Sequence, residues 1–186
     1  MGVFADAARV GLDVVLPLRH QVLRAGRPFE EARLPGDDDP ETAHFAVRAA
    51  SHGAASRGEA SGGAVQDGRV QDGRVQGGHV QEGEVVTVVS VMREAPPWDG
   101  TSGWRLRGMA TAPAVRGRGG GAAAVRALIT HVAAHGGGLL WCAARMPAVG
   151  FYRRMGFQER GEPWTHPEYG PHVYMSRLVQ AGSADG

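Results

Sequence analysis

The stretch Trp104–Gly121, WRLRGMATAPAVRGRGGG, decides the fold. It opens with alternating side chains that predict a β-strand, and Pro113 ends that strand because proline has no N–H to donate to a sheet. The glycine-dense turn Arg116–Gly121 follows, and from Ala122 the pattern becomes helical. This succession predicts a backbone site for an anion, because glycines let main-chain N–H groups approach a phosphate and a helix N-terminus is partly positive.

Three kinds of phosphate site compete for this turn. A nucleoside triphosphate loop would end in Gly-Lys-Ser/Thr, which does not occur here. A dinucleotide-binding turn is nominally matched by the glycines, but it expects an acidic residue about 20 residues later, at the end of a second strand, and none follows. The third kind is the acetyl-CoA loop Gln/Arg-x-x-Gly-x-Gly/Ala, which Arg116, Gly119 and Gly121 match in register.

The segment Gly108–Phe157 resembles the cofactor half of the GNAT superfamily of N-acetyltransferases. The matching pieces are RGMATAP, VRGRGGG, LLWCAAR and FYRRMGF, in family order and spacing. Two further pieces, GEPW at Gly161–Trp164 and GPHVYM at Gly170–Met175, resemble the C-terminal end of one bacterial branch. One position departs from that branch, because Ala143 stands where an asparagine is usual, which puts a side-chain contact in doubt but not backbone pairing.

The resemblance implies an α/β (α+β) fold with a mixed sheet flanked by helices. Its two central strands, Arg105–Thr111 and Leu139–Ala144, would splay apart and leave backbone groups free to pair with the extended pantetheine arm of acetyl-CoA. The diphosphate of acetyl-CoA would lie on the glycine turn. The residues expected to bind acetyl-CoA are Met109, Ala110, Thr111, Arg116, Gly117, Arg118, Gly119, Gly120, Gly121 and Ala122.

The same resemblance implies a catalytic group on the helix after the second splayed strand. Tyr152 matches the family's tyrosine, the acid that protonates the leaving thiolate, and a backbone N–H near Met109 or Ala110 would stabilise the oxyanion. The base is left open between His172, which is favoured, His44 and a water relay. Cys142 lies in an apolar strand and is interpreted as a core residue, since direct transfer in a ternary complex needs no nucleophilic thiol.

The leading functional hypothesis is an acetyl-CoA-dependent N-acetyltransferase that acts on a primary amine of a small molecule or peptide. The alternatives are a non-catalytic acyl-CoA-binding module and a nicotinamide dinucleotide-binding protein. With 186 residues the chain is expected to form one domain. The formal net charge of +1 argues for neither nucleic acid nor a membrane as partner, and a homodimer is left open.

The number of cysteines and the length of the apolar runs indicate the cellular compartment in which the protein is expected. The single cysteine suits a reducing cytoplasm, and no apolar run is long enough for a transmembrane helix or a signal peptide. The acid run Asp37–Asp39 lacks further ligands at defined spacing, so no metal is expected.

The remaining elements are predicted from periodicity. Arg19, His20 and Arg24 lie on a first helix, where a solvated face is favoured over a role in lining an acceptor cleft. A loop is predicted for Arg27–Pro40. The helices are expected at Val10–Leu23, from Ala122 to the glycines at 136–138, and at Pro147–Met155, and the outer strands at His44–Arg48, Val85–Met92, Phe157–Glu159 and His172–Leu178.

Residues Ala49–Glu84 differ in kind from the rest of the chain. The pentad Val65–Arg69, VQDGR, recurs with small changes up to Glu84. A period of five fits neither a strand, where successive valines would alternate between faces, nor a helix, where they would drift around the axis. The pattern predicts a repeat-expanded loop inserted between two strands of the single domain 1–186.

Overall fold

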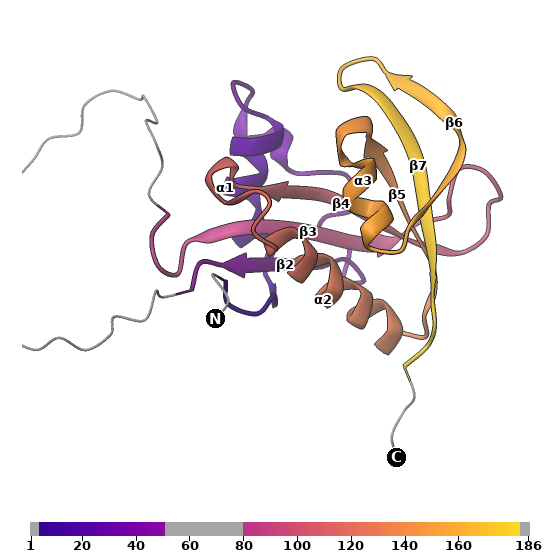
Figure 1. Cartoon of the computed structure of the whole chain (residues 1–186), viewed down its shortest axis with the longest axis horizontal. Helices are drawn as coiled ribbons and strands as arrows, with labels where there is room; N and C mark the ends of the chain where they lie inside the picture. Colours follow the sequence, from indigo (N-terminus) through magenta and orange to yellow (C-terminus); the bar gives the residue numbers. More distant parts are fainter. Residues whose placement is uncertain (1–3, 51–79, 183–186) are drawn as a thin grey trace, which may run out of the picture.

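The computed structural model describes residues 4–50 and 80–182, and its centre is a seven-stranded sheet in the order β1-β2-β3-β4-β5-β7-β6 (Figure 1). Neighbouring strands are antiparallel except for β4 and β5, which are parallel. The predicted class, a mixed sheet flanked by helices, is confirmed. The strands are β1 (Ala8–Val10), β2 (Ala43–Arg48), β3 (Val85–Arg93), β4 (Gly103–Thr111), β5 (Gly138–Arg145), β6 (Gln158–His166) and β7 (Gly170–Val179).

Three α-helices and three short 3₁₀ turns connect these strands within the described residues. The helices are α1 (Leu12–Leu23), α2 (Gly120–Ala134) and α3 (Val149–Arg154), and the turns are η1 (Phe29–Ala32), η2 (Pro113–Val115) and η3 (Met146–Ala148). Among these, no helix combines the length and the apolar character needed to span a bilayer.

Helices cover both faces of the sheet. Every residue of β2 from Ala43 to Val47 is buried, and successive side chains of a strand point to opposite faces, so both faces need cover. His44 belongs to the hydrogen-bond network of Arg19 in α1. The next residue, Phe45, has its ring centroid 5.6 Å from that of His131 in α2. Helices α1 and α2 therefore pack on opposite faces.

Valines form the centre of the core. Val86, Val88, Val89 and Val91 of β3 are 0% exposed, and α2 adds Val125, Leu128 and Val132, also 0% exposed. Each such side chain contributes about 1.5–3 kcal/mol when fully buried. The β-branched run and the helical stripe seen in the sequence thus account for the packing of α2 on β3.

Three elements differ from the sequence-based predictions. The pattern does not predict β1, whose three residues carry no alternation of apolar side chains. The turn η1 forms inside the stretch predicted as a loop. Strand β6 continues to His166 instead of ending at Glu159, although it contains Pro163. It tolerates the proline because β6 is an edge strand with a pairing irregularity between Arg160 and Trp164.

The segment with the pentads begins and ends at one place on the sheet. The Ala49 N–H donates to the Glu84 carbonyl over 2.9 Å, and the Gly83 N–H donates to the Ala49 carbonyl over 3.0 Å. The Arg48 guanidinium also donates to the Gly83 carbonyl over 2.8 Å. The pentads over residues 65–79 lie outside the described residues, and the last one, at 80–84, contains a turn.

Candidate functional site

The parallel strands β4 and β5 pair only where they begin. Their register runs from Gly103 opposite Leu139 to Arg105 opposite Trp141, whereas β4 continues to Thr111 and β5 to Arg145. The strands therefore diverge after this short pairing, as the resemblance implies. Their later backbone groups are free on the sides that face each other.

A bulge in β4 lies at this opening. Val88 and Ser90 of β3 pair with Ala110 and Arg107, so Gly108 and Met109 together lie opposite one residue, Val89. Gly108 has φ 60°, in the left-handed region that glycine adopts at bulges. The bulge therefore changes the alternation of side chains just before Met109 and Ala110.

The glycine turn leads from β4 into α2. Gly117 and Gly119 have φ values of 77° and 97°, and Gly119 is the residue that precedes the helix. The Arg116 Nε donates to the Thr111 carbonyl over 3.2 Å and so ties the turn to the end of β4. The first helical bond is that of the Ala123 N–H to the Gly119 carbonyl. The N–H groups before Ala123 lack helical partners and can bind an anion.

A cavity of about 740 Å³ joins the glycine turn, the free part of β4 and helix α3. All but Arg118 of the residues expected to bind acetyl-CoA line it. Tyr152, the residue predicted as the acid, lines it as well. The sequence did not point to the other wall residues. For Arg145 a signal exists, because it directly follows a predicted parallel strand, where ligands of such sheets gather. These additional wall residues are Val22, Leu23, Val115, Arg145, Pro147, Ala148, Phe151 and Arg154.

Tyr152 lies in the wall of this cavity and is almost fully buried. Its hydroxyl donates to the sulfur of Met109 over 3.5 Å, and its ring packs edge-on against Phe151 and Phe157, with centroids 5.1 and 5.4 Å away. Burial raises the pKa of Tyr152 well above its ordinary value, so the phenol is protonated at neutral pH. Cys142 is 2% exposed, and burial raises the pKa of its thiol to about 12, which agrees with the predicted core role.

His172 lies outside the cavity wall. On β5 and β7, Tyr174 packs against Trp141, whereas the adjacent Cys142 faces Tyr152. His172 shares the face of Tyr174 by strand alternation and therefore lies on the other face of the sheet from Tyr152. Its Nδ1 is 2.8 Å from the Gly170 carbonyl, and its ring stacks on Trp164 at 5.2 Å.

Arg19 corrects the expectation of a solvated helix face. It is 1% exposed, and its guanidinium bonds Asp37 Oδ2 at 2.5 Å and Ser90 Oγ at 2.6 Å. Arg107 reaches the other Asp37 oxygen at 3.1 Å. Burial alone would raise the pKa of Asp37, but the Leu34 N–H and the two guanidinium groups outweigh it and lower the pKa.

This buried network also contains the bulge and His44. A Cβ on Gly108 would lie 2.7 Å from Arg19 Nε, so the guanidinium packs directly against the bulge. His44 bonds Ser90 Oγ at 2.7 Å and the Asp37 carbonyl at 3.1 Å, and burial lowers the pKa of its imidazole. Both ring nitrogens are therefore occupied, and His44 lies under α1 rather than in the cavity.

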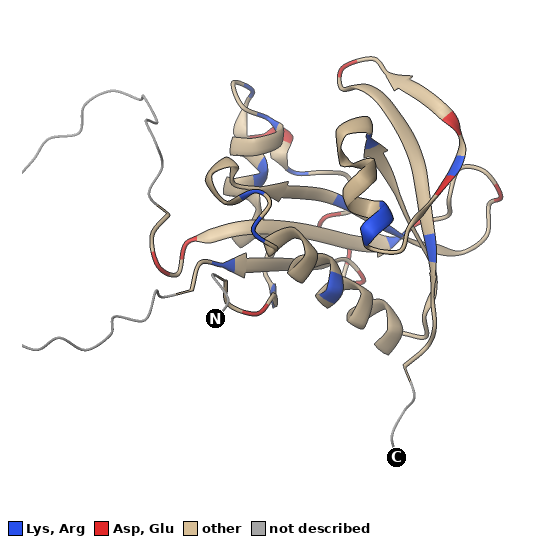
Figure 2. Cartoon of the chain, in the orientation of Figure 1, with Lys and Arg blue, Asp and Glu red and all other residues tan. Residues whose placement is uncertain are grey.

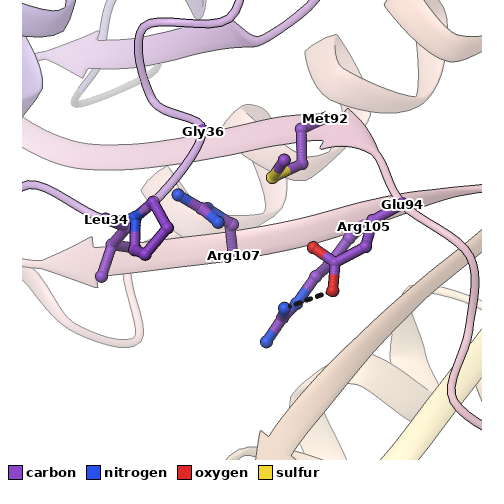
Figure 3. A pocket seen from close by; sticks show the side chains of 7 residues that line it. Leu34, Gly36, Met92, Glu94, Arg105 and Arg107 are labelled. Carbon is purple, nitrogen blue, oxygen red and sulfur yellow. Dashed lines mark hydrogen bonds and ion pairs between the residues drawn. The ribbon is translucent and has the colours of Figure 1, made fainter.

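A second cavity, of about 470 Å³, lies between the loop before β2 and the strands β3 and β4 (Figure 3). Figure 3 shows the side chains of Glu94 and Arg105 directed at each other, and their ion pair measures 2.7 Å. Arg105 also covers the Trp141 ring at 4.9 Å. The sequence does not reveal this cavity by any motif, although the alternation of Arg105 and Arg107 along β4 signals a shared face. The lining residues are Leu34, Pro35, Gly36, Met92, Glu94, Arg105 and Arg107.

The aspartate run does not form a joint site. Asp37 pairs with Arg19 and Arg107, and Asp38 pairs with Arg33. Asp39 accepts the Glu41 N–H over 2.8 Å. Over residues 4–50 and 80–182, the structure brings together no group of three or more His, Cys, Asp or Glu side chains that could hold a metal ion.

A family model and a curated relative both match this chain to acetyltransferases. A model of the acetyltransferase (GNAT) family matches residues 39–157. The uncharacterized N-acetyltransferase YitI of Bacillus subtilis is 34% identical over 79 residues, which are 42% of this chain and only 53% of that protein.

Solved acetyltransferases share the fold at low sequence identity. An aminoglycoside 6′-N-acetyltransferase complexed with coenzyme A superposes with a TM-score of 0.60 at 13% identity, over 96% of this chain and 99% of that one. The ribosomal-protein-S18-alanine N-acetyltransferase from Escherichia coli gives 0.59 at 11% identity, over 98% of both chains.

Proposed function

Because this chain belongs to the acetyltransferase (GNAT) family, we propose that it is an acetyl-CoA-dependent N-acetyltransferase. It moves the acetyl group to a primary amine of a small molecule or peptide by direct attack in a ternary complex. The observation that carries the proposal is one cavity that joins the glycine turn, the free edge of β4 and Tyr152. These are the three contacts that an extended thioester with a diphosphate needs.

The cavity offers contacts for the diphosphate, the pantetheine arm and the acetyl group of acetyl-CoA. The free N–H groups of Gly120, Gly121 and Ala122 and the partial positive charge of α2 suit the diphosphate. The free edge of β4 can pair with the amides of the pantetheine arm as an added strand would. The acetyl carbonyl then lies beside Met109 and Ala110, where a backbone N–H can donate to the oxyanion.

Tyr152 is the proposed acid. When the amine attacks the thioester carbon, the carbon–sulfur bond breaks and the thiolate needs a proton. The Tyr152 hydroxyl already lies 3.5 Å from one sulfur, that of Met109, and burial keeps it protonated. It can therefore transfer its proton to the sulfur of CoA and recover one from solvent.

His172 is the proposed base, with a water relay as the alternative. Its Nδ1–H donates to the Gly170 carbonyl, so Nε2 is the nitrogen that would accept the proton of the amine. An acceptor that approaches from the face of α1 would meet His172 on β7, and it would reach the thioester where β4 and β5 diverge. The acid and the base would then act from opposite faces of the sheet.

The direct experiment is thiol release from acetyl-CoA across a panel of primary amines, polyamines, amino acids and peptides. The chain contains no lysine, so it has no side-chain amine that could compete as an acceptor. We expect amine-dependent release of CoA with one class of acceptor and a matching gain of one acetyl group in its mass. Binding of acetyl-CoA without release for any amine would instead indicate a non-catalytic acyl-CoA-binding module.

We further propose that the chain forms one acetyltransferase domain, into which the segment at about residues 49–84 is inserted. The family match runs across this segment from residue 39 to residue 157, and β2 and β3, on either side of it, are neighbours in the sheet.

A further inference from the structure

Three arginines surround a separate cavity between α2, α3 and β7. It has a volume of about 570 Å³, and no carboxylate lies in its lining. Arg126 comes from the second turn of α2, Arg154 from the end of α3 and Arg177 from β7. Figure 2 shows basic segments on these three elements. The other lining residues are Ile129, Thr130, Met155 and Gly156.

The positive charges of these arginines are not neutralised. Across residues 4–50 and 80–182, none of the three forms an ion pair. Arg177 donates to the Met155 carbonyl over 2.6 Å, while its Nε is buried and finds no hydrogen-bond partner in the described chain. By contrast, the adjacent Arg153 pairs with Glu159. Guanidinium groups gathered without carboxylates around one cavity are suited to an anion with several oxygens.

This cavity adjoins the proposed cofactor site. Arg154 lines both cavities. Arg126 follows Ala122 by about one helical turn, a rise of roughly 6 Å along α2. A ligand whose diphosphate lies on the first turn of α2 can therefore place a second anionic group among the three arginines.

We propose that Arg126, Arg154 and Arg177 bind a phosphomonoester dianion, the 3′-phosphate on the ribose of CoA, and so make this protein selective for CoA over its 3′-dephospho form. The inference rests on the proposed function, because it takes the diphosphate to lie on the glycine turn. The 3′-phosphate is one ribose ring away from that diphosphate. Its three oxygens can accept hydrogen bonds from more than one guanidinium at once.

The test is calorimetry with CoA and 3′-dephospho-CoA on the full chain. We expect the native protein to bind CoA at least about tenfold more tightly at low salt, with the ratio shrinking as salt rises. Arg126→Ala should weaken CoA binding by about fivefold and leave dephospho-CoA binding unchanged. Arg154→Ala should lower the same ratio. The matched control is Arg153→Ala, which removes a neighbouring exposed arginine outside the cavity and should keep the native ratio.

Several results would overturn the inference. Equal affinity of the native protein for both cofactors would exclude a 3′-phosphate site. If Arg153→Ala lowered the ratio of CoA to dephospho-CoA affinity as much as Arg126→Ala does, the selectivity would come from general surface charge and not from this cavity. If inorganic phosphate bound at the arginines of CoA-saturated protein, the cavity would serve a free anion instead. Failure of both cofactors to bind would refute the proposed function itself, which tight but unselective binding would leave standing.

Discussion

The phenol of Tyr152 is buried and lies beside the thioether of Met109. In Tyr152→Phe the ring and its edge-on contacts remain and one oxygen is lost, so stability should hardly change. We expect turnover to fall by about tenfold, the low end for a general acid, because a thiolate is already a fair leaving group. The affinity for acetyl-CoA should be unchanged.

Single-turnover kinetics, in which chemistry limits the rate, would measure this effect. Native-like single-turnover rates in Tyr152→Phe would assign the residue to packing alone. They would leave protonation of the thiolate to water.

Gly119 allows a comparison between two glycines of similar conformation. Gly119 and Gly100 have φ values of 97° and 67°, and a Cβ on either would meet nothing within 4 Å. Alanine at either position should therefore cost a similar stability, about 1–2 kcal/mol. Only Gly119 lines the cavity, so only Gly119→Ala should weaken acetyl-CoA binding, by about tenfold or more.

Thermal melts and calorimetry on both variants separate strain from binding. An equal loss of affinity in Gly100→Ala would show that strain, and not a blocked diphosphate site, explains the effect.

At the scale of elements, Asp37 connects α1 to the sheet. It accepts hydrogen bonds from Arg19 of α1 and Arg107 of β4, and it is 3% exposed. Asp37→Ala would leave buried guanidinium groups without their anion, so the free energy of unfolding should fall by about 3–5 kcal/mol. The neighbouring Asp38→Ala removes an exposed pair with Arg33 and should change it by less than about 1 kcal/mol.

Urea unfolding of the two variants provides the measurement. Similar losses at both positions would contradict the role of Asp37 as a connection between elements, because only one of these carboxylates is buried.

The sequence predicts the residues of the cofactor cavity better than the buried network of Arg19 and Asp37. The reason is how far apart in the sequence the interacting residues lie. Positive φ at Gly117 and Gly119 and the start of α2 are local properties, which a glycine turn reveals directly. The partner of Arg19 lies 18 residues away and Ser90 lies 71 away, so only the fold brings them together. A local sign existed: Arg19 follows the buried Val15 by one helical turn and shares its face.

Other differences have equally specific causes. The strand is predicted to end at Glu159, but β6 continues through Pro163, because its position at the sheet edge removes the need for the proline's N–H. The arginine cavity draws on α2, α3 and β7, and no spacing in the sequence links Arg126 to Arg177.

For the whole molecule, the buried His44 and the half-buried His131 set the dependence of stability on acid. Burial lowers the pKa of His44, and mainly burial lowers that of His131 to about 4. The unfolded chain therefore binds protons at higher pH than the folded one. The free energy of unfolding should have its full value above about pH 6.5 and should decrease by about 1–2 kcal/mol as the pH falls to 4.

Chemical denaturation across this range measures the decrease, and His131→Gln should make it shallower. Asp37 affects stability at lower pH than the histidines do. Because its pKa is lowered in the folded protein, its contribution to the free energy of unfolding is lost only when the pH falls below the ordinary pKa of aspartate. A flat profile from pH 7 to 4 would contradict the lowered pKa values of these two imidazoles.

The inserted segment can be removed as a test of the single-domain proposal. Deletion of residues 56–79 keeps Ala49, Gly83 and Glu84, whose hydrogen bonds join the two ends. Shortening a loop of this length changes the closure free energy by only about 1 kcal/mol. We expect one cooperative thermal transition and unchanged acetyl-CoA affinity, and a non-cooperative melt would show that the pentads are structural.

The joined ends at Ala49 and Gly83 also have a genetic consequence. Where the codons repeat along with the pentads, copying of the gene can slip, and gain or loss of a whole repeat preserves the reading frame. Because both ends are held at adjacent positions beside β2 and β3, such events leave the register of these strands unchanged. Alleles that differ in repeat number should therefore all encode the same sheet.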